Sequence, residues 1–189
     1  MKNKKISGLL YTAVMGVAVL SLASCAEKKF RVSGTITQAK DSVLYLENMS
    51  LNGPKAVDSV KLDENGEFEF KQKAPEAPEF YRLRIANQMV NLAVDSTENI
   101  TVKAAYPTMS ANYEVSGSEE CTKIRDLAYM QLELQTHVAA IANSSSLGVQ
   151  AVEDSVAKVL EVYKNKVKLN YIFKEPMKAY AYYALFQTI

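Results

Sequence analysis

The stretch Gly66-Glu67-Phe68-Glu69-Phe70-Lys71 alternates aromatic and charged side chains. Successive side chains of a β-strand point to opposite faces, so this pattern predicts a strand with both phenylalanines in a core and the charged residues in solvent. The residues just before it, 63–66, end in Asn-Gly, a dipeptide typical of the turn in a β-hairpin. We therefore expect a hairpin here and a mainly β fold around it.

Other segments between residues 30 and 116 alternate in the same way or form short apolar runs bounded by turn residues. Asn-Gly-Pro at 52–54 and the segment 74–78, with two prolines, are expected to interrupt the strands. Seven or eight short strands at this spacing favour an antiparallel β-sandwich or barrel over residues 30–116. Besides 67–71, the predicted strands are residues 30–36, 43–46, 57–62, 80–85, 90–94 and 99–103, with a short one at 113–115.

From Ser118 onward the hydrophobic period becomes that of a helix. Ser118 is a typical helix cap, and Glu119 and Glu120 suit the positive end of the helix dipole. Two apolar stripes predict a helical hairpin joined by the serine-rich turn at 143–148, and Pro176 is expected in the first turn of a third helix over 177–189. The stripes are Ile124, Leu127, Ala128, Gln131, Leu134, Val138 and Ile141, and then Val152, Val156, Val159, Tyr163, Val167 and Tyr171.

The third helix carries five aromatic or large apolar residues between positions 180 and 186 and has no stop signal. This is more apolar surface than one helical face can present to a two-helix partner. We therefore expect residues 118–189 to form a helical connector that is cut short. Its third helix is expected to dock a further domain, encoded downstream in relatives or supplied by another chain.

The first 24 residues are typical of a cleaved secretory signal, with three lysines before an apolar run at 6–20 that is short for a membrane span. Leu22, Ala23, Ser24 and Cys25 then resemble the lipobox of bacterial lipoproteins at all four positions. That resemblance implies cleavage before Cys25, a lipid on its thiol and a tether over residues 25–29. Two or more acyl chains hold a protein stably at a membrane. An ordinary secretory signal with a chance cysteine is the alternative.

Removal of the signal leaves 165 residues (189 − 24), enough for one domain with an appendage. Without the three signal lysines, 19 basic and 21 acidic residues remain, so the net charge is −2. A chain this close to neutral is not expected to bind nucleic acid or a lipid surface through basic patches. Cys121 has only Cys25 as a fellow cysteine, so we expect no internal disulfide. It is either a small buried helix residue or a reactive thiol with a pKa lowered by Arg125.

Residues that suggest catalysis are few. His137 is the only histidine and is expected at the edge of the first helical stripe, which leaves no multi-histidine metal site. Asp63, Glu64, Asp95 and Glu98 fall in turns, where carboxylates cap backbone amides; a glycosidase pair is the weaker interpretation. We therefore expect no catalytic residue, cofactor, metal or enzymatic activity. The C-terminal tyrosines are expected to pack in a core or interface, or to line a carbohydrate or partner surface: Tyr163, Tyr171, Tyr180, Tyr182 and Tyr183.

Several of these segments together resemble a domain of unknown function at the N-terminus of Bacteroidetes-type lipoproteins. They are residues 30–37, 43–46, 58–60, 66–70, 81–85 and 99–102. The resemblance covers roughly residues 28–116, and residues 173–176 and 181–186 resemble the helical connector that follows that domain. In thiol-disulfide oxidoreductases of this kind, a thioredoxin-like domain of the TlpA/ResA type often comes next. Its Trp-Cys-x-x-Cys motif is absent here, so no catalytic residue carries over.

Two functions are compatible with this sequence. The first is a lipid-anchored lipoprotein of the cell envelope, facing the periplasm or the cell surface. By the resemblance, it is the non-catalytic accessory part of a thiol-disulfide oxidoreductase, with a thioredoxin-like domain or another envelope protein docked on its C-terminal helices. The alternative is a free-standing envelope module that binds a glycan or a protein, through a sheet face or through the tyrosine-rich helices.

Overall fold

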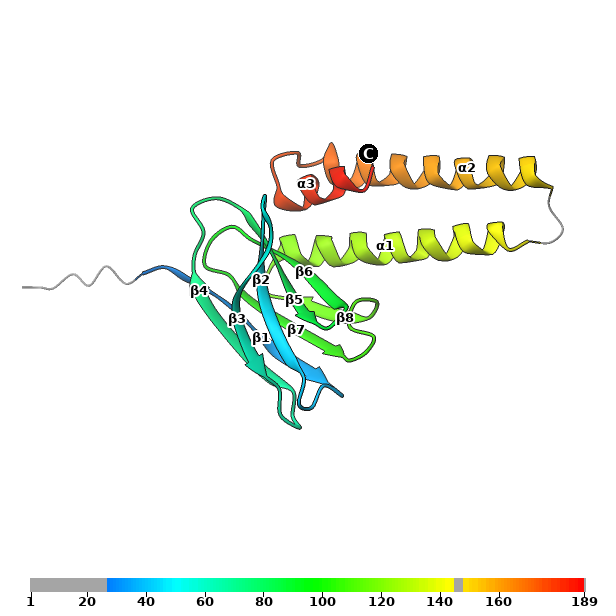
Figure 1. Cartoon of the computed structure of the whole chain (residues 1–189). Helices are drawn as coiled ribbons and strands as arrows, with labels where there is room; N and C mark the ends of the chain where they lie inside the picture. Colours follow the sequence, from blue (N-terminus) through cyan, green and yellow to red (C-terminus); the bar gives the residue numbers. More distant parts are fainter. Residues whose placement is uncertain (1–26, 145–147, 189) are drawn as a thin grey trace, which may run out of the picture.

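A computed structural model describes residues 27–144 and 148–188. Within these residues, eight strands are followed by three α-helices and one short π-helical turn, which confirms the predicted order of a β-sandwich and then helices (Figure 1). The strands are β1 (Lys29–Thr37), β2 (Val43–Ser50), β3 (Gly53–Lys61), β4 (Glu67–Lys73), β5 (Glu79–Ile85), β6 (Gln88–Val94), β7 (Asn99–Ala105) and β8 (Tyr113–Ser116). The helices are α1 (Glu119–Ala142), α2 (Val149–Val167), the π-turn η1 (Lys168–Ile172) and α3 (Ala179–Phe186).

The strands form two four-stranded sheets, in the orders β4-β1-β7-β8 and β3-β2-β5-β6. Apolar side chains of both sheets meet in a single buried cluster, in which Phe68 and Phe70 take part as their alternation predicts. Phe30 of β1 and Tyr81 of β5 lie against each other across the sandwich, with ring centroids 4.9 Å apart. The fold is thus a sandwich rather than a closed barrel.

The turn at residues 63–66 does not form the expected hairpin. It leads from β3, which pairs with β2, to β4, which pairs with β1 in the other sheet. Asp63 does stabilise the turn, because its carboxylate accepts the backbone N–H groups of Asn65 and Gly66 at 2.9 and 3.0 Å. The Gly66 carbonyl then accepts the N–H of Ile36 at 2.9 Å, which ties the turn to the end of β1. Asn-Gly therefore specifies a chain reversal, whereas long-range pairing decides which strand lies beside which.

Two details of the strands differ from the expected pattern. Gly53 and Pro54 do not interrupt the pattern but begin β3, where a proline is tolerated because β3 is an edge strand of its sheet. The sheets are also not purely antiparallel, since β1 pairs parallel with β7. Alternation of side chains reports which face is buried and carries no information about strand direction.

Gly34 marks the closest approach of β1 and β7. Its φ is +153°, and a Cβ atom built there would lie 1.7 Å from the carbonyl oxygen of Val102. Only glycine fits this position, which explains why the series of inward apolar side chains in β1 skips residue 34.

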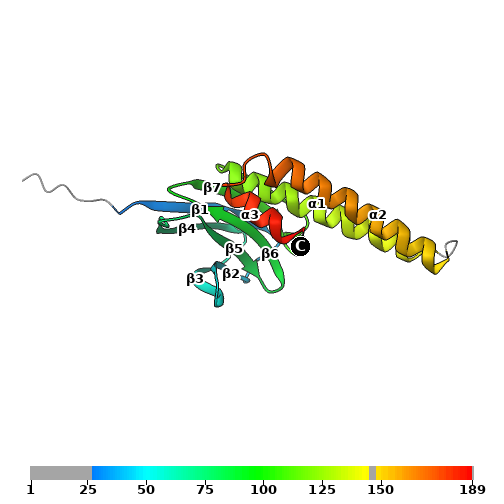
Figure 2. The ribbon, with the colours of Figure 1, turned by 90° about the horizontal axis from the view of Figure 1, so that it is seen from above.

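Helix α1 begins as predicted, with the Ser118 hydroxyl accepting the N–H of Cys121 at 3.2 Å. It packs against α2 as the expected hairpin, around Leu127, Tyr163 and Val167. Figure 2 shows this hairpin extending away from the sandwich, while α3 lies close to the strands.

Helix α3 is shorter than expected, and Pro176 lies before it rather than in its first turn. The residues ahead of the helix form a tight turn closed by a hydrogen bond from the Lys178 N–H to the Glu175 carbonyl at 3.1 Å. Pro176 occupies the second position of that turn, where its fixed φ is favourable.

Glu120 of α1 fixes the start of α3. Its carboxylate accepts the backbone N–H of Tyr180 at 2.9 Å, which replaces the side-chain cap that α3 does not provide for itself. Tyr180 is only 1% exposed, and Ala179 and Ala181 pack with it against Ile124 of α1. Helix α3 is thereby held over the outer face of β6.

Candidate functional site

A pocket of about 370 Å³ opens between the outer face of the β3-β2-β5-β6 sheet and the helices. Its floor comes from Phe80 and Tyr81 of β5 and Asn91 of β6, with Met49 of β2 at one side. Gln131 of α1 and three residues at the end of α3 form the other walls: Tyr183, Phe186 and Gln187. The lining contains no charged side chain.

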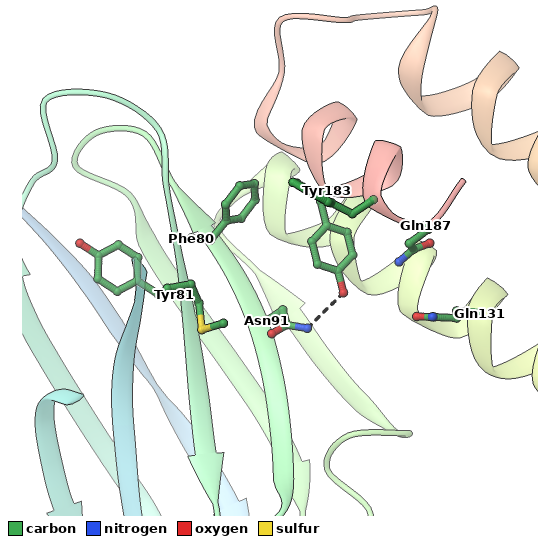
Figure 3. A pocket seen from close by; sticks show the side chains of 8 residues that line it. Phe80, Tyr81, Asn91, Gln131, Tyr183 and Gln187 are labelled. Atoms are coloured by element: carbon green, nitrogen blue, oxygen red, sulfur yellow. Dashed lines mark hydrogen bonds between the residues drawn. The ribbon is translucent and has the colours of Figure 1, made fainter. Parts of the chain in front are cut away.

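One hydrogen bond joins the floor of the pocket to its helical wall. The Asn91 side-chain amide donates to the Tyr183 hydroxyl at 3.1 Å, and Figure 3 shows Tyr183 descending from α3 toward Asn91. The rings of Phe80 and Tyr183 lie 6.3 Å apart between centroids, whereas the Tyr81 ring points away from Tyr183 in the same view. These contacts set the position of α3 above the sheet, and they leave Asn91 and Tyr183 accessible in the pocket.

Other polar groups of the pocket retain hydrogen-bonding capacity. The Gln131 side chain makes no hydrogen bond with any residue that the structure describes. The Gln187 side-chain carbonyl accepts from the Tyr163 hydroxyl at 2.6 Å, while the Gln187 side-chain N–H₂ has no partner among these residues. Each primary amide offers two donors and one carbonyl acceptor. The pocket therefore presents donors and acceptors beside aromatic rings.

A charged cluster lies beside the pocket on the same sheet face. Glu47 of β2 is 5% exposed, and its two carboxylate oxygens accept from Arg82 and Arg84 of β5 at 2.5 and 2.8 Å. Burial opposes ionisation of Glu47, but the hydrogen bonds and charges of the two arginines outweigh it and lower its pKa. Because the arginines are engaged by this carboxylate, the cluster has a structural role and does not present a free cationic site.

Cys25, the residue expected to carry the lipid, and the expected cleavage junction, Leu22, Ala23, Ser24 and Cys25, lie outside the described part of the chain, as does the signal segment. Lipidation at Cys25 therefore stays a prediction. Within the described residues, no helix is both long enough and apolar enough to cross a membrane.

Cys121 was expected to be either a small buried helix residue or a reactive thiol, and the structure shows the buried residue. It is 0% exposed, and its thiol donates to the carbonyl of Ala93 at 3.3 Å. Burial raises the pKa of the thiol to about 11. The suggestion that Arg125 lowers this pKa is wrong, because that guanidinium binds its neighbour Asp126 at 2.7 Å.

The other candidates for chemistry lie on α1 and in two turns of the sandwich. His137 is exposed on α1, at a shallow hollow between α1 and α2. Glu98 caps the turn that follows β6 by accepting the N–H groups of Asp95 and Ser96 at 3.0 Å each, and Glu64 pairs with Lys40. No group of three metal-binding side chains occurs in the described ranges.

The five C-terminal tyrosines divide between packing and the pocket. Tyr163 and Tyr180 are buried, and Tyr171 is half-buried against Tyr180, with ring centroids 6.2 Å apart. Tyr182 is half-exposed, and Tyr183 is the one that lines the pocket. Packing is therefore confirmed for Tyr163 and Tyr180, whereas a carbohydrate or partner surface stays a prediction.

The remaining pocket residues were not predicted from the sequence. Asn91 offers the one usable signal, a polar residue at an outward position of a strand that is otherwise almost wholly apolar from residue 89 to 94. An outward apolar neighbour, Ala93, is buried beneath the helices, so this face of the strand is covered. Gln131 and Gln187 carry no such signal, because their relevance depends on how the helices lie over the sheet.

Comparison with known proteins gives one match to a family model. Residues 30–123 match the model of a protein family described as a domain of unknown function (DUF4369). The match covers the sandwich except for Lys29, the first residue of β1, and continues into the first residues of α1. No curated protein matches the chain.

Proposed function

We propose that this chain, with its sandwich in that family of unknown function, is a non-catalytic, lipid-anchored binding module of the bacterial cell envelope. The observation that carries the proposal is the pocket between β5, β6, α1 and α3. It combines accessible aromatic rings with amides and holds no titratable group suited to acid, base or nucleophilic chemistry at neutral pH. The lipobox at Leu22–Cys25 supports attachment to a membrane.

Anchoring is tested by the variant Cys25→Ser in cells fed a radiolabelled fatty acid. The native chain is expected to take up label, to lose its signal and to fractionate with membranes. The variant should remain unlabelled and unprocessed, because the thiol is the only group in the motif that can accept the lipid. Equal labelling and membrane attachment of the two chains would refute the anchor.

Binding is tested by thermal unfolding of the full chain with and without a soluble extract of the cell envelope. A ligand that binds only the folded state raises Tm. The native chain and a matched surface variant, Phe173→Ala, are expected to respond, whereas the pocket variant Phe186→Ala is not. Equal responses of the two variants, or no response of the native chain, would refute a pocket-based binding function.

A second candidate function has an observation of its own. Around α3, a set of large apolar side chains is exposed outside the pocket lining: Met177, Tyr182 and Leu185. These residues support the interpretation that the chain is the accessory part of a thiol-disulfide oxidoreductase, with a thioredoxin-like partner docked on its C-terminal helices.

This candidate is tested by placing a photo-crosslinking amino acid at position 185 in the native cell. A control carries it at position 149, where Val149 is equally apolar and highly exposed at the start of α2. The accessory interpretation predicts a crosslink from 185 to a protein with a Cys-x-x-Cys motif and none from 149. Its absence, or identical products from both sites, would exclude this interpretation.

A further inference from the structure

We propose that the pocket beside α3 binds a neutral saccharide, with one sugar ring against the aromatic wall and its hydroxyls on the pocket amides. The inference rests on the proposed binding function and names the class of ligand. It follows from the charge, hydrogen-bonding groups and shape of the pocket.

The charge of the lining excludes an ionic ligand. The pocket lining contains no Asp, Glu, Lys, Arg or His. Arg82 and Arg84, two cations on the same sheet face, are both bound to Glu47. A carboxylate or phosphate ligand would lose its hydration without gaining a countercharge, and a cationic ligand would do the same.

The hydrogen-bonding groups exclude a purely apolar ligand. Asn91, Gln131 and Gln187 bring amide donors and acceptors into the pocket, and the Tyr183 hydroxyl lies between Asn91 and Gln131 in Figure 3. An acyl chain would displace water from these groups without replacing the lost hydrogen bonds, which is costly. Sugar hydroxyls both donate and accept, and they match amide groups that do the same.

The aromatic wall supplies the apolar half of a saccharide site. Phe186 is 77% exposed although it lines the pocket, and Phe80 and Tyr183 present further ring surface. A large exposed aromatic residue gains free energy when a ligand covers it. One face of a pyranose ring carries mainly C–H groups and can lie flat on such a side chain.

The shape of the pocket favours a compact ring over an extended peptide. Its volume of about 370 Å³ lies within the range of small-molecule sites, roughly 300–1,000 Å³. Peptides are commonly recognised by backbone pairing at a sheet edge. Here the floor is formed by β5 and β6, and the β5 backbone is already paired to β2 and β6 on its two sides.

The inference is tested by calorimetric titration of the full chain, purified in a zwitterionic detergent without a sugar headgroup. The neutral probes are glucose, N-acetylglucosamine, maltose and lactose. Glucuronic acid serves as the charged counterpart and Nile red as the apolar one. We expect at least one neutral sugar to bind with a Kd in roughly the millimolar range. Glucuronic acid and Nile red are expected to bind more weakly than that sugar.

Two pairs of variants connect binding to the pocket. Phe186→Ala is expected to weaken sugar binding about tenfold or more, whereas Phe173→Ala removes a ring of similar exposure, 67%, outside the pocket and should leave binding unchanged. Gln131→Ala should weaken binding about threefold to tenfold through a lost hydrogen bond, and Gln135→Ala, one turn along the same exposed face, should not. Neither glutamine side chain has a hydrogen-bond partner among the described residues, so neither change is expected to disturb folding.

The possible outcomes separate this inference from the proposed function. Sugar binding that is lost with Phe186→Ala and retained with Phe173→Ala supports both. The saccharide inference is overturned, and the proposed binding function is kept, if the Tm response to the envelope extract depends on the pocket but no neutral sugar binds, or if glucuronic acid or Nile red binds more tightly. If neither the Tm response to the extract nor the binding of any probe depends on Phe186, both the inference and the proposed function are overturned.

Discussion

Replacing Glu120 by alanine removes a contact that spans 60 residues of sequence and holds α3 in place. The Glu120 carboxylate accepts the buried N–H of Tyr180 near the start of α3, and Lys178 stands 3.7 Å away. Alanine leaves that N–H without an acceptor. An unsatisfied buried donor costs about 1–3 kcal/mol, and the loss of a helix cap costs about 0.5–2 kcal/mol. Both figures describe the loss of the same hydrogen bond, so we expect Glu120→Ala to lower the free energy of unfolding by about 2 kcal/mol in total.

The matched control is Glu119→Ala. Glu119 is the adjacent acid in the first turn of α1, so its loss weakens the same interaction with the helix dipole, worth about 0.3–1 kcal/mol, but it is exposed and caps nothing in α3. Urea unfolding followed by circular dichroism should therefore show a larger loss of stability for Glu120→Ala. For a chain of this size, about 2 kcal/mol corresponds to a Tm lower by about 4–8 °C.

The conservative variant Glu120→Gln tests whether the bond or the charge matters. Burial raises the pKa of Glu120, against the lowering effects of the Tyr180 N–H and Lys178, so the ionised form costs the folded state free energy at neutral pH. Glutamine keeps an acceptor without that cost and should be as stable as the native chain or slightly more so. The native chain should gain stability relative to the Glu120→Gln variant as the pH falls through the folded pKa of Glu120. If Glu120→Ala were no less stable than Glu119→Ala, the assigned role of Glu120 would be wrong.

Three further changes test other parts of the structure. Phe70→Ala should cost about 3–5 kcal/mol in urea unfolding because Phe70 is buried between the sheets, and a loss below about 1 kcal/mol would contradict that position. Because the folded state lowers the pKa of Glu47, its ionised form contributes stability that is fully present above the ordinary pKa of 4.5 and is lost as the pH falls through the folded pKa. Glu47→Gln should therefore reduce the loss of stability at acid pH. An unchanged dependence of stability on pH would exclude this contribution. The Cys121 thiol should react with a thiol reagent only after unfolding, since it is buried with a pKa of about 11, and rapid labelling of the native chain would show that it is accessible.

The sequence allows good prediction of features that depend on local periodicity. The strands around Phe68 and Phe70, and the start of α1 at Ser118, follow from side-chain alternation and from a single capping residue. Features that depend on long-range pairing were not predictable in this way. The turn at 63–66 leads to a different sheet from the expected one, and β1 pairs parallel with β7, because pairing is decided by the packing of the whole sandwich.

The pocket could be predicted only in part, for the same reason. Tyr183 belonged to a set of tyrosines expected either to pack or to line a surface, but the sequence does not say which member does which. Asn91 and Gln131 lie 40 positions apart on different elements, and both line the pocket only because α1 packs against β6. A constellation assembled from five segments leaves no spacing motif in the sequence.

The most direct test of the central claim is an NMR titration of the full chain with the soluble envelope extract, following side-chain amide signals. Asn91 and Gln131 report on the pocket, and Gln135 on the same helix reports on the surface outside it. The proposed function predicts that the signals of Asn91 and Gln131 shift in a saturable way, that Gln135 does not move, and that Phe186→Ala abolishes the shifts. Saturable shifts elsewhere on the molecule, with Asn91 and Gln131 unchanged, would contradict the assignment of the binding site to this pocket.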